Sequence, residues 1–142
     1  MIFFRVDGNK NIGLGHIYRC TDFIKRQKIK KFLILTYNKQ EVQKISILKK
    51  KIVLLKSKYS ESKQIENLKK KYKAKLIVID IPKISFGYQN ILKNAFPKSI
   101  FIMDKINSEY KNELIIDPAI IKKEKKINNI YFGASPFIEF KQ

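Results

Sequence analysis

The chain has a single histidine, His16, which directly follows a turn containing Gly13 and Gly15. Glycines permit backbone angles and a close ligand approach that a side chain would block. A helix beginning near His16 would point its unpaired N–H groups at the same place, which favours a phosphate or another anion. The positive end of the helix dipole disfavours imidazolium, so we expect a neutral ring that acts as a general base. The alternative is an ordinary histidine at a helix N-terminus with a capping role.

Acidic residues are expected near this turn. Asp7 precedes it in the same loop, whereas Asp80, Asp104 and Asp117 each close an apolar run of the sequence. Carboxylates in these places can contact sugar hydroxyls or orient His16. Each of them can equally cap the next helix or turn. We take Asp7 as the strongest of these candidates because it shares a loop with His16.

Two further residues lie within the predicted helix. Arg19 stands one helical turn after His16 on the same face, where it can hold a negative group or orient the loop. For Cys20 we expect a buried, inert thiol, because free cysteine behaves as a small apolar residue. With one cysteine there is no internal disulfide, and no Cys/His cluster has metal-ligand spacing. We therefore expect no metal site.

Two common phosphate-binding motifs are excluded at the glycine turn. A dinucleotide fingerprint requires a third glycine where Tyr18 stands, and the apolar run 32–36 is not followed by an acid for a ribose. A P-loop requires Gly-Lys-Ser/Thr, whereas Gly15 precedes His16 and Ile17. The sequence supports neither NAD nor Mg-ATP chemistry, and we expect no cofactor.

Apolar runs alternate with helix-forming segments along the chain. The expected strands are 2–6, 32–36, 52–55, 76–79, 100–103 and 114–116, and the expected helices are 15–29, 39–50, 60–72 and 85–95. Short runs without polar alternation suit strands that are buried on both faces. The sequence therefore predicts an α/β fold, a Rossmann-like parallel sheet with helices on both faces, as a single domain over residues 1–142. Ligands of such sheets bind beyond the carboxyl ends of the strands, where the glycine turn lies.

The formal net charge of +19 would normally indicate a polyanionic partner. Nearly all of the basic residues are lysines, however, and the arginines that direct base readout favours are only Arg5, Arg19 and Arg26. We therefore do not expect nucleic acid to be the partner. The alternative function is a non-catalytic basic module that binds an acidic partner or nucleic acid. No apolar segment suits a signal peptide or a membrane span, so we expect a cytoplasmic protein without membrane insertion.

Residues 5–20, RVDGNKNIGLGHIYRC, resemble the family of UDP-sugar hydrolases that act in pseudaminic acid biosynthesis and the related spore-coat polysaccharide biosynthesis proteins. The shared pattern is Arg-X-Asp, a short polar loop, Ile-Gly-X-Gly-His and X-X-Arg-Cys. It is matched by Arg5, Asp7, Ile12, Gly13, Gly15, His16, Arg19 and Cys20. Weaker similarity lies at 76–80, 100–104, 113–118 and 131–138. The chain departs from the family at Ile81 and Pro82, where His-Tyr is common, and at Lys105, where a second acid is often found.

The resemblance implies a glycosyltransferase-like architecture of the GT-B type. This chain would be its N-terminal half, without the C-terminal nucleotide-binding domain. The implied reaction is hydrolysis of UDP-2,4-diacetamido-2,4,6-trideoxy-beta-L-altropyranose or a related sugar nucleotide. The C–O bond at the anomeric carbon is cleaved, and UDP is released without a metal. Alone, such a chain is expected to be weakly active, and its partners would be the UDP-sugar and a separate C-terminal domain.

The resemblance also assigns roles to residues of this chain. His16 would activate the attacking water, and Gly13 and Gly15 would give room for the sugar and the diphosphate. Asp7 and Arg19 would support the loop. The remaining candidates for substrate binding are Asp80 and Asp104, which close two of the expected strands.

Overall fold

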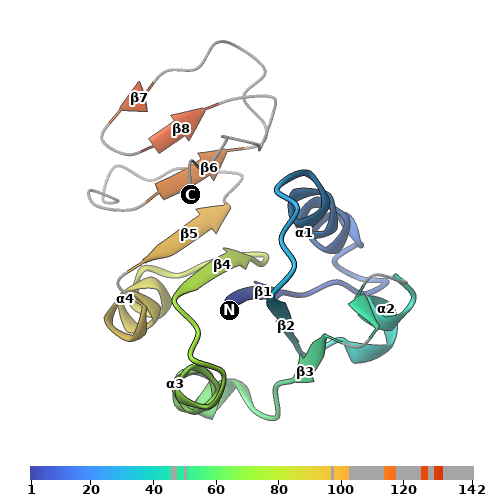
Figure 1. The fold of residues 1–142 in the computed structure, drawn as a ribbon, viewed down its shortest axis with the longest axis horizontal. Helices are drawn as coiled ribbons and strands as arrows, with labels where there is room; N and C mark the ends of the chain where they lie inside the picture. The colour runs from blue at the N-terminus through green and yellow to red at the C-terminus, as the bar shows by residue number, and fades with distance from the viewer. Residues whose placement is uncertain are drawn as a thin grey trace.

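The computed structural model describes residues 1–45, 48–49, 51–96, 98–102, 114–117, 126–127 and 130–132. Within these ranges the strands form one eight-stranded sheet in the order β3-β2-β1-β4-β5-β6-β8-β7 (Figure 1). The strands are β1 (Ile2–Val6), β2 (Phe32–Thr36), β3 (Ile52–Leu54), β4 (Leu76–Asp80), β5 (Ser99–Ile102), β6 (Leu114–Asp117), β7 (Lys126–Ile127) and β8 (Ile130–Phe132). All neighbours pair in parallel except β7 and β8, which are antiparallel. The predicted Rossmann-like α/β fold is confirmed.

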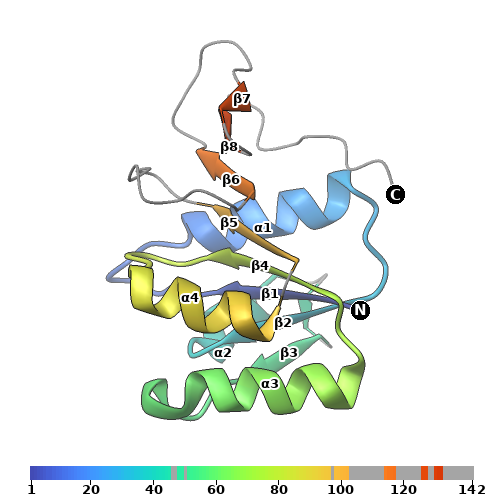
Figure 2. The same ribbon diagram turned by 90° about the vertical axis from the view of Figure 1, so that its left-hand side faces the viewer.

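The helices cover both faces of the sheet. They are α1 (Gly15–Arg26), α2 (Lys39–Gln43), α3 (Glu61–Tyr72) and α4 (Phe86–Ala95), with a short 3-10 turn, η2 (Lys58–Ser60), before α3. Helices α1 and α2 lie on one face, and α3 and α4 lie on the other (Figure 2). In the described ranges, no helix is both long and apolar enough to cross a membrane.

Each face of the sheet has its own apolar core, because side chains of β1 alternate between the faces. Phe3 points towards α3 and α4, where its ring contacts Tyr72 and Phe96 at centroid distances of 6.4 and 5.9 Å. Phe4 points towards α1 and contacts Phe23 at 6.0 Å. The continuous apolar run of β1 is therefore explained by burial on both sides of the sheet.

Two expected helices are shorter than predicted. The helix expected over 39–50 ends at Gln43, because the chain continues with the tighter i to i+3 hydrogen bonds, from Lys44 N–H to Glu41 O and from Ile45 N–H to Val42 O. The helix expected over 15–29 ends at Arg26. Two residues later Lys28 takes a left-handed φ of 51°, with which an α-helix cannot continue.

Helix α3 ends in the same manner. Lys73 adopts a left-handed φ of 51°, and the N–H of Ala74 donates to the carbonyl of Lys69. This bond belongs to a Schellman ending, in which the left-handed position is usually glycine because a Cβ is strained there.

We expect Lys73→Gly to raise the free energy of unfolding by about 1 kcal/mol, because glycine takes the left-handed angles without strain. Urea denaturation would measure the change. The matched control is Lys70→Gly inside the last turn of α3, which should lower stability by a similar amount through lost helix propensity. A loss of stability in both variants would contradict the strain argument.

Candidate active site

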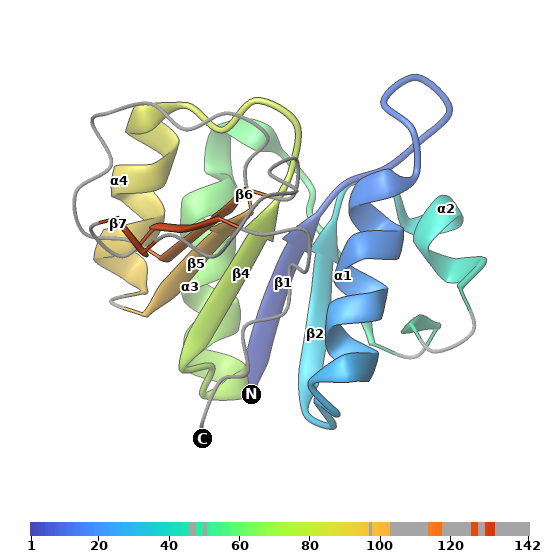
Figure 3. The same ribbon diagram turned by 90° about the horizontal axis from the view of Figure 1, so that it is seen from above.

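The loop between β1 and α1, residues 7–14, is called the glycine loop. It stands at the edge of the sheet where the parallel strands have their carboxyl ends, which is called the carboxyl edge (Figure 3). Its shape is set locally: Asn9 Oδ1 accepts hydrogen bonds from the N–H groups of Asn11 and Ile12, at 2.8 and 3.0 Å. Gly13 has a φ of 77°, which favours glycine, and a Cβ there or at Gly15 would meet no atom within 4 Å. The described residues therefore leave open space at the side-chain position of both glycines.

Gly8 lacks room for a side chain, and sequence reasoning missed this constraint. A Cβ at Gly8 would lie 2.4 Å from Cδ1 of Ile17, which is fully buried. A side chain at position 8 would therefore require the buried side chain of Ile17 to move.

The structure brings His16 and Asp80 together. His16 lies in the first turn of α1 and Asp80 closes β4, and Nδ1 of His16 is 2.7 Å from Oδ1 of Asp80. The Asp80 side chain is completely buried, whereas 16 % of the His16 side chain is exposed. Because a carboxylate oxygen can only accept, the hydrogen lies on Nδ1. In the neutral ring, Nε2 is then the nitrogen that can accept a proton.

Arg19 fixes the same carboxylate. Its Nε donates to Oδ2 of Asp80 at 2.7 Å and its Nη2 donates to Oδ1 at 2.6 Å, which is a bidentate ion pair. Nη2 also lies 3.1 Å from Nδ1 of His16. Nη2 of Arg19 and Nδ1 of His16 both carry hydrogen, so both donate to Oδ1 of Asp80 and not to each other. The buried negative charge is thereby compensated and its two oxygens are held in place.

Cys20 lies under this cluster. It is fully buried, and its Sγ is 3.8 Å from Oδ2 of Asp80. Burial, followed by the charge of Asp80, raises the pKa of the Cys20 thiol well above its ordinary value, against the smaller opposite effect of Arg19. The predicted inert thiol is confirmed as a buried one, because nucleophilic chemistry requires the thiolate.

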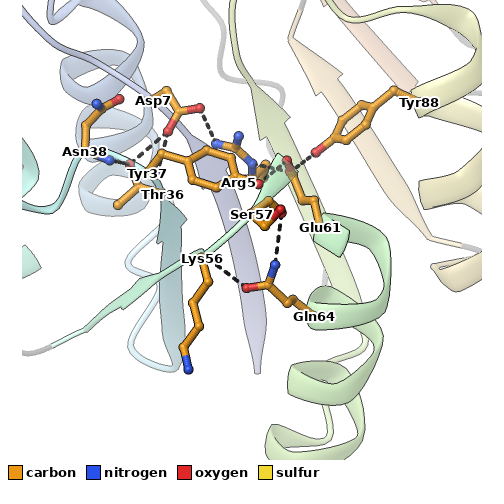
Figure 4. A network of polar contacts seen from close by, with 10 residues as sticks. All are labelled: Arg5, Asp7, Thr36, Tyr37, Asn38, Lys56, Ser57, Glu61, Gln64 and Tyr88. Atoms are coloured by element: carbon orange, nitrogen blue, oxygen red, sulfur yellow. Dashed lines mark hydrogen bonds and ion pairs between the residues drawn. The ribbon is translucent and has the colours of Figure 1, made fainter. Parts of the chain in front are cut away.

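A second polar network occupies the opposite face of the sheet at the same edge (Figure 4). Arg5 of β1 is 2 % exposed; its Nε lies 2.5 Å from Oε1 of Glu61, and its Nη1 lies 2.7 Å from Oδ2 of Asp7. The hydroxyl of Tyr37 donates to Oε2 of Glu61 at 2.9 Å, and the hydroxyl of Tyr88 donates to Oε1.

The charges of this network stabilise one another. Burial alone would lower the pKa of Arg5, but the nearby Asp7, Tyr88 and Glu61 outweigh it and raise that pKa. The pKa values of Tyr37 and Tyr88 are raised, first by burial and also by Glu61, so both phenols stay neutral donors. The network therefore ties β1 and β2 to the helices α3 and α4.

A cleft of about 550 Å³ opens beside this network. It is lined by Arg5, Asp7, Asn9, Ile12, Tyr37, Asn38, Lys58, Glu61, Ile81, Pro82, Lys83, Ser85 and Tyr88. Asn9 and Ile12 of the glycine loop line the cleft, whereas His16 lies just after the loop, in the first turn of α1. Lys83, on the rim, has a left-handed φ of 54°.

The predicted site residues thus divide into two groups. His16, Arg19 and Asp80 meet in one cluster, and they do not line the cleft. Asp7 does line the cleft, and its carboxylate contacts Arg5, Thr36 and Tyr37 rather than His16. Asp104 lies outside the described residues. Of Asp117 only the backbone, at the end of β6, is described.

Sequence reasoning named Asp7 of the second network but missed the role of Arg5 and the other members. Arg5 had a usable signal, because a charged residue inside an apolar run that is buried on both faces requires a buried partner. Glu61 and the two tyrosines had none, because their partner lies more than twenty residues away along the chain. In the described parts of the chain, no cluster of three or more His, Cys, Asp or Glu residues could hold a metal ion.

In comparisons with known protein families and with curated proteins, nothing matches this chain. The fold and the two clusters define it as a Rossmann-like α/β protein with polar networks at the carboxyl edge of its parallel sheet.

We expect Arg5→Met to lower the free energy of unfolding by about 3–5 kcal/mol, because Glu61 would stay buried without its counter-charge. Urea denaturation would measure the loss. The control is Arg26→Met, which removes a pair with Asp22 whose side chains are 58 % and 46 % exposed, and which should cost at most about 1 kcal/mol. Equal losses in both variants would contradict a special role for the buried network.

We expect Cys20 to react with a thiol-specific reagent only when the protein unfolds, because it is buried and its raised pKa disfavours the thiolate. The labelling rate at mildly alkaline pH, with and without urea, would show this. Rapid labelling of the native protein would mean that reagent and solvent reach the space beneath Asp80.

Proposed function

We propose that this chain supplies the catalytic base of a sugar-nucleotide hydrolase, with His16 as the base. The observation that carries the proposal is the 2.7 Å contact between Nδ1 of His16 and the buried carboxylate of Asp80. A buried carboxylate that holds one ring nitrogen fixes the tautomer and the orientation of the ring, so that the other nitrogen can take a proton. The resemblance of residues 5–20 to UDP-sugar hydrolases supplies the reaction.

The proposed step is an attack of water on the anomeric carbon. Nε2 of His16 accepts a proton from the water as its oxygen bonds to that carbon. The bond from the carbon to the diphosphate oxygen breaks, and its electron pair leaves with UDP. The imidazolium that forms is stabilised by Asp80, whose position is held by the two hydrogen bonds from Arg19.

Features of the surrounding loop support this assignment. The N-terminus of α1 has no side-chain cap, so its first N–H groups are available to an anionic diphosphate. Gly13 and Gly15 leave open space beside them. In this proposal, a separate C-terminal domain binds the uridine.

We expect the chain to release UDP slowly from UDP-sugars, and much faster when a C-terminal half of a related hydrolase is added. His16→Ala should lower the rate of the combined halves by about 10²–10⁴-fold, which is the usual contribution of a general base. Asp80→Asn should also lower the rate, because the tautomer is no longer fixed. UDP release from several UDP-N-acetylated sugars would be measured across a range of pH.

The matched control is Tyr18→Ala, which alters an exposed side chain in the same turn of α1 and should leave the rate within about threefold. Circular dichroism would verify that each variant folds. Unchanged turnover in His16→Ala would remove the assigned base. Equally efficient turnover without the C-terminal half would overturn the need for a second domain.

A further inference from the structure

The edge of the sheet opposite the glycine loop is rich in lysine. The backbone bonds from Ile2 N–H to Lys31 O and from Lys75 N–H to Met1 O place Lys31 and Lys75 on either side of the start of β1. Ile77 N–H donates to Lys98 O, so Lys98 follows at the start of β5. These three lysines are exposed. They therefore form a row across β2, β1, β4 and β5, in which neighbouring strands are about 4.8 Å apart.

The ends of two long helices flank this row. Because each helix runs back between parallel strands, α1 and α3 both end at this edge (Figure 3). The exposed lysines here include Lys25 and Lys28 at the end of α1 and Lys70, Lys71 and Lys73 at the end of α3. These five lysines and the three of the row make eight lysines, which are together called the amino face. A cavity of about 630 Å³ beside α3 is lined by lysines of this face and by Glu66.

Acidic residues are concentrated elsewhere in the described part of the chain. Asp7, Glu61 and Asp80 take part in the networks at the carboxyl edge, and Glu41 lies in α2, just after the carboxyl end of β2. Asp22 is paired with Arg26. The amino face therefore carries a strong positive charge, with Glu66 the acid that borders it.

Helix dipoles account for only part of this arrangement. Cations in the last turn of α3 stabilise its negative end, but that argument does not apply to lysines at strand starts. The exposed large apolar residues of the described chain are Ile12, Tyr18, Leu54, Tyr59 and Ile91, and none lies at a strand start or a helix end of this edge. Binding at the amino face would therefore use charge alone, without apolar insertion and without aromatic stacking on bases.

We propose that the amino face docks the protein onto an anionic phospholipid surface. The face spreads over four strand starts and two helix ends, so a planar array of lipid phosphates meets more of its lysines than a cylindrical duplex, which meets a flat face along one line. Lysine suits this role because it acts as a point charge that needs no fixed acceptor geometry. In this orientation the glycine loop and the cleft face away from the lipid and stay open to solvent.

The test is co-sedimentation of the chain with vesicles of phosphatidylcholine, or of an equimolar mixture of phosphatidylcholine and phosphatidylglycerol. We expect binding to the mixed vesicles only, and we expect it to weaken steeply as salt is added. The triple variant Lys31→Glu, Lys75→Glu, Lys98→Glu should lower the affinity by roughly 100-fold or more, because each lysine near the surface contributes separately.

The matched control is Lys39→Glu, Lys56→Glu, Lys63→Glu, which changes the net charge equally through exposed lysines towards the carboxyl edge. Its affinity should fall by less than about tenfold. Circular dichroism would verify that both variants fold. Equal losses in the two variants, or no binding to mixed vesicles at low salt, would overturn the proposal. Tighter binding to duplex DNA at the same salt, lost in the first variant alone, would assign the face to nucleic acid instead.

Discussion

The carboxylate of Asp80 is the constraint on which the candidate site depends. It is completely buried at the end of β4, and an ionised carboxylate in such a place is tolerated only when it is paired and hydrogen-bonded. Arg19 supplies the opposite charge and occupies both oxygens, and His16 supplies a further donor to one of them. Because both partners come from the first turns of α1, the burial of one carboxylate fixes the start of that helix against the central strand.

The same solution recurs on the other face with different residues. Arg5 of β1 and Asp80 of β4 project to opposite sides of neighbouring strands, since Arg5 pairs with Ile79 in the sheet and Asp80 pairs with Val6. On this face a buried cation, Arg5, is paired with the carboxylates of Glu61 and Asp7. At Asp80, in contrast, a buried carboxylate is paired with a cation. Together the two networks hold the glycine loop from both sides: one fixes the helix that follows it, and the other fixes Asp7 at its beginning.

The strands were predictable because burial on both faces favours apolar residues at nearly every position, and such runs are visible in the sequence without any partner being known. The runs at 2–6, 32–36 and 76–79 agree with the observed strands within a residue. Helix ends were less predictable: α2 stops at Gln43 although helix-forming residues continue, and lysines at positions 28 and 73 take left-handed angles that sequence reasoning reserves for glycine. Orientation of His16 was one of three roles considered for Asp80, because the carboxyl end of β4 and the start of α1 lie at the same edge of the sheet. The Arg5 network could not be deduced, since nothing local to Glu61, Tyr37 or Tyr88 indicates that they share one guanidinium.

The distribution of charge follows from the topology of the sheet. In a parallel sheet with returning helices, the positive ends of the helix dipoles gather at the carboxyl edge and the negative ends gather at the amino edge. The acids Asp7, Glu61 and Asp80 lie at the positive ends, and the exposed lysines that end α1 and α3 lie at the negative ends. At both edges, side chains of opposite charge stabilise the helix ends, but the carboxyl edge uses acids and the amino edge uses lysines. At the carboxyl edge the acids Asp7, Glu61 and Asp80 are paired with Arg5 and Arg19 beside a polar cleft. At the amino edge the described lysines of the amino face are exposed, and the proposed attraction to an anionic surface would act through them.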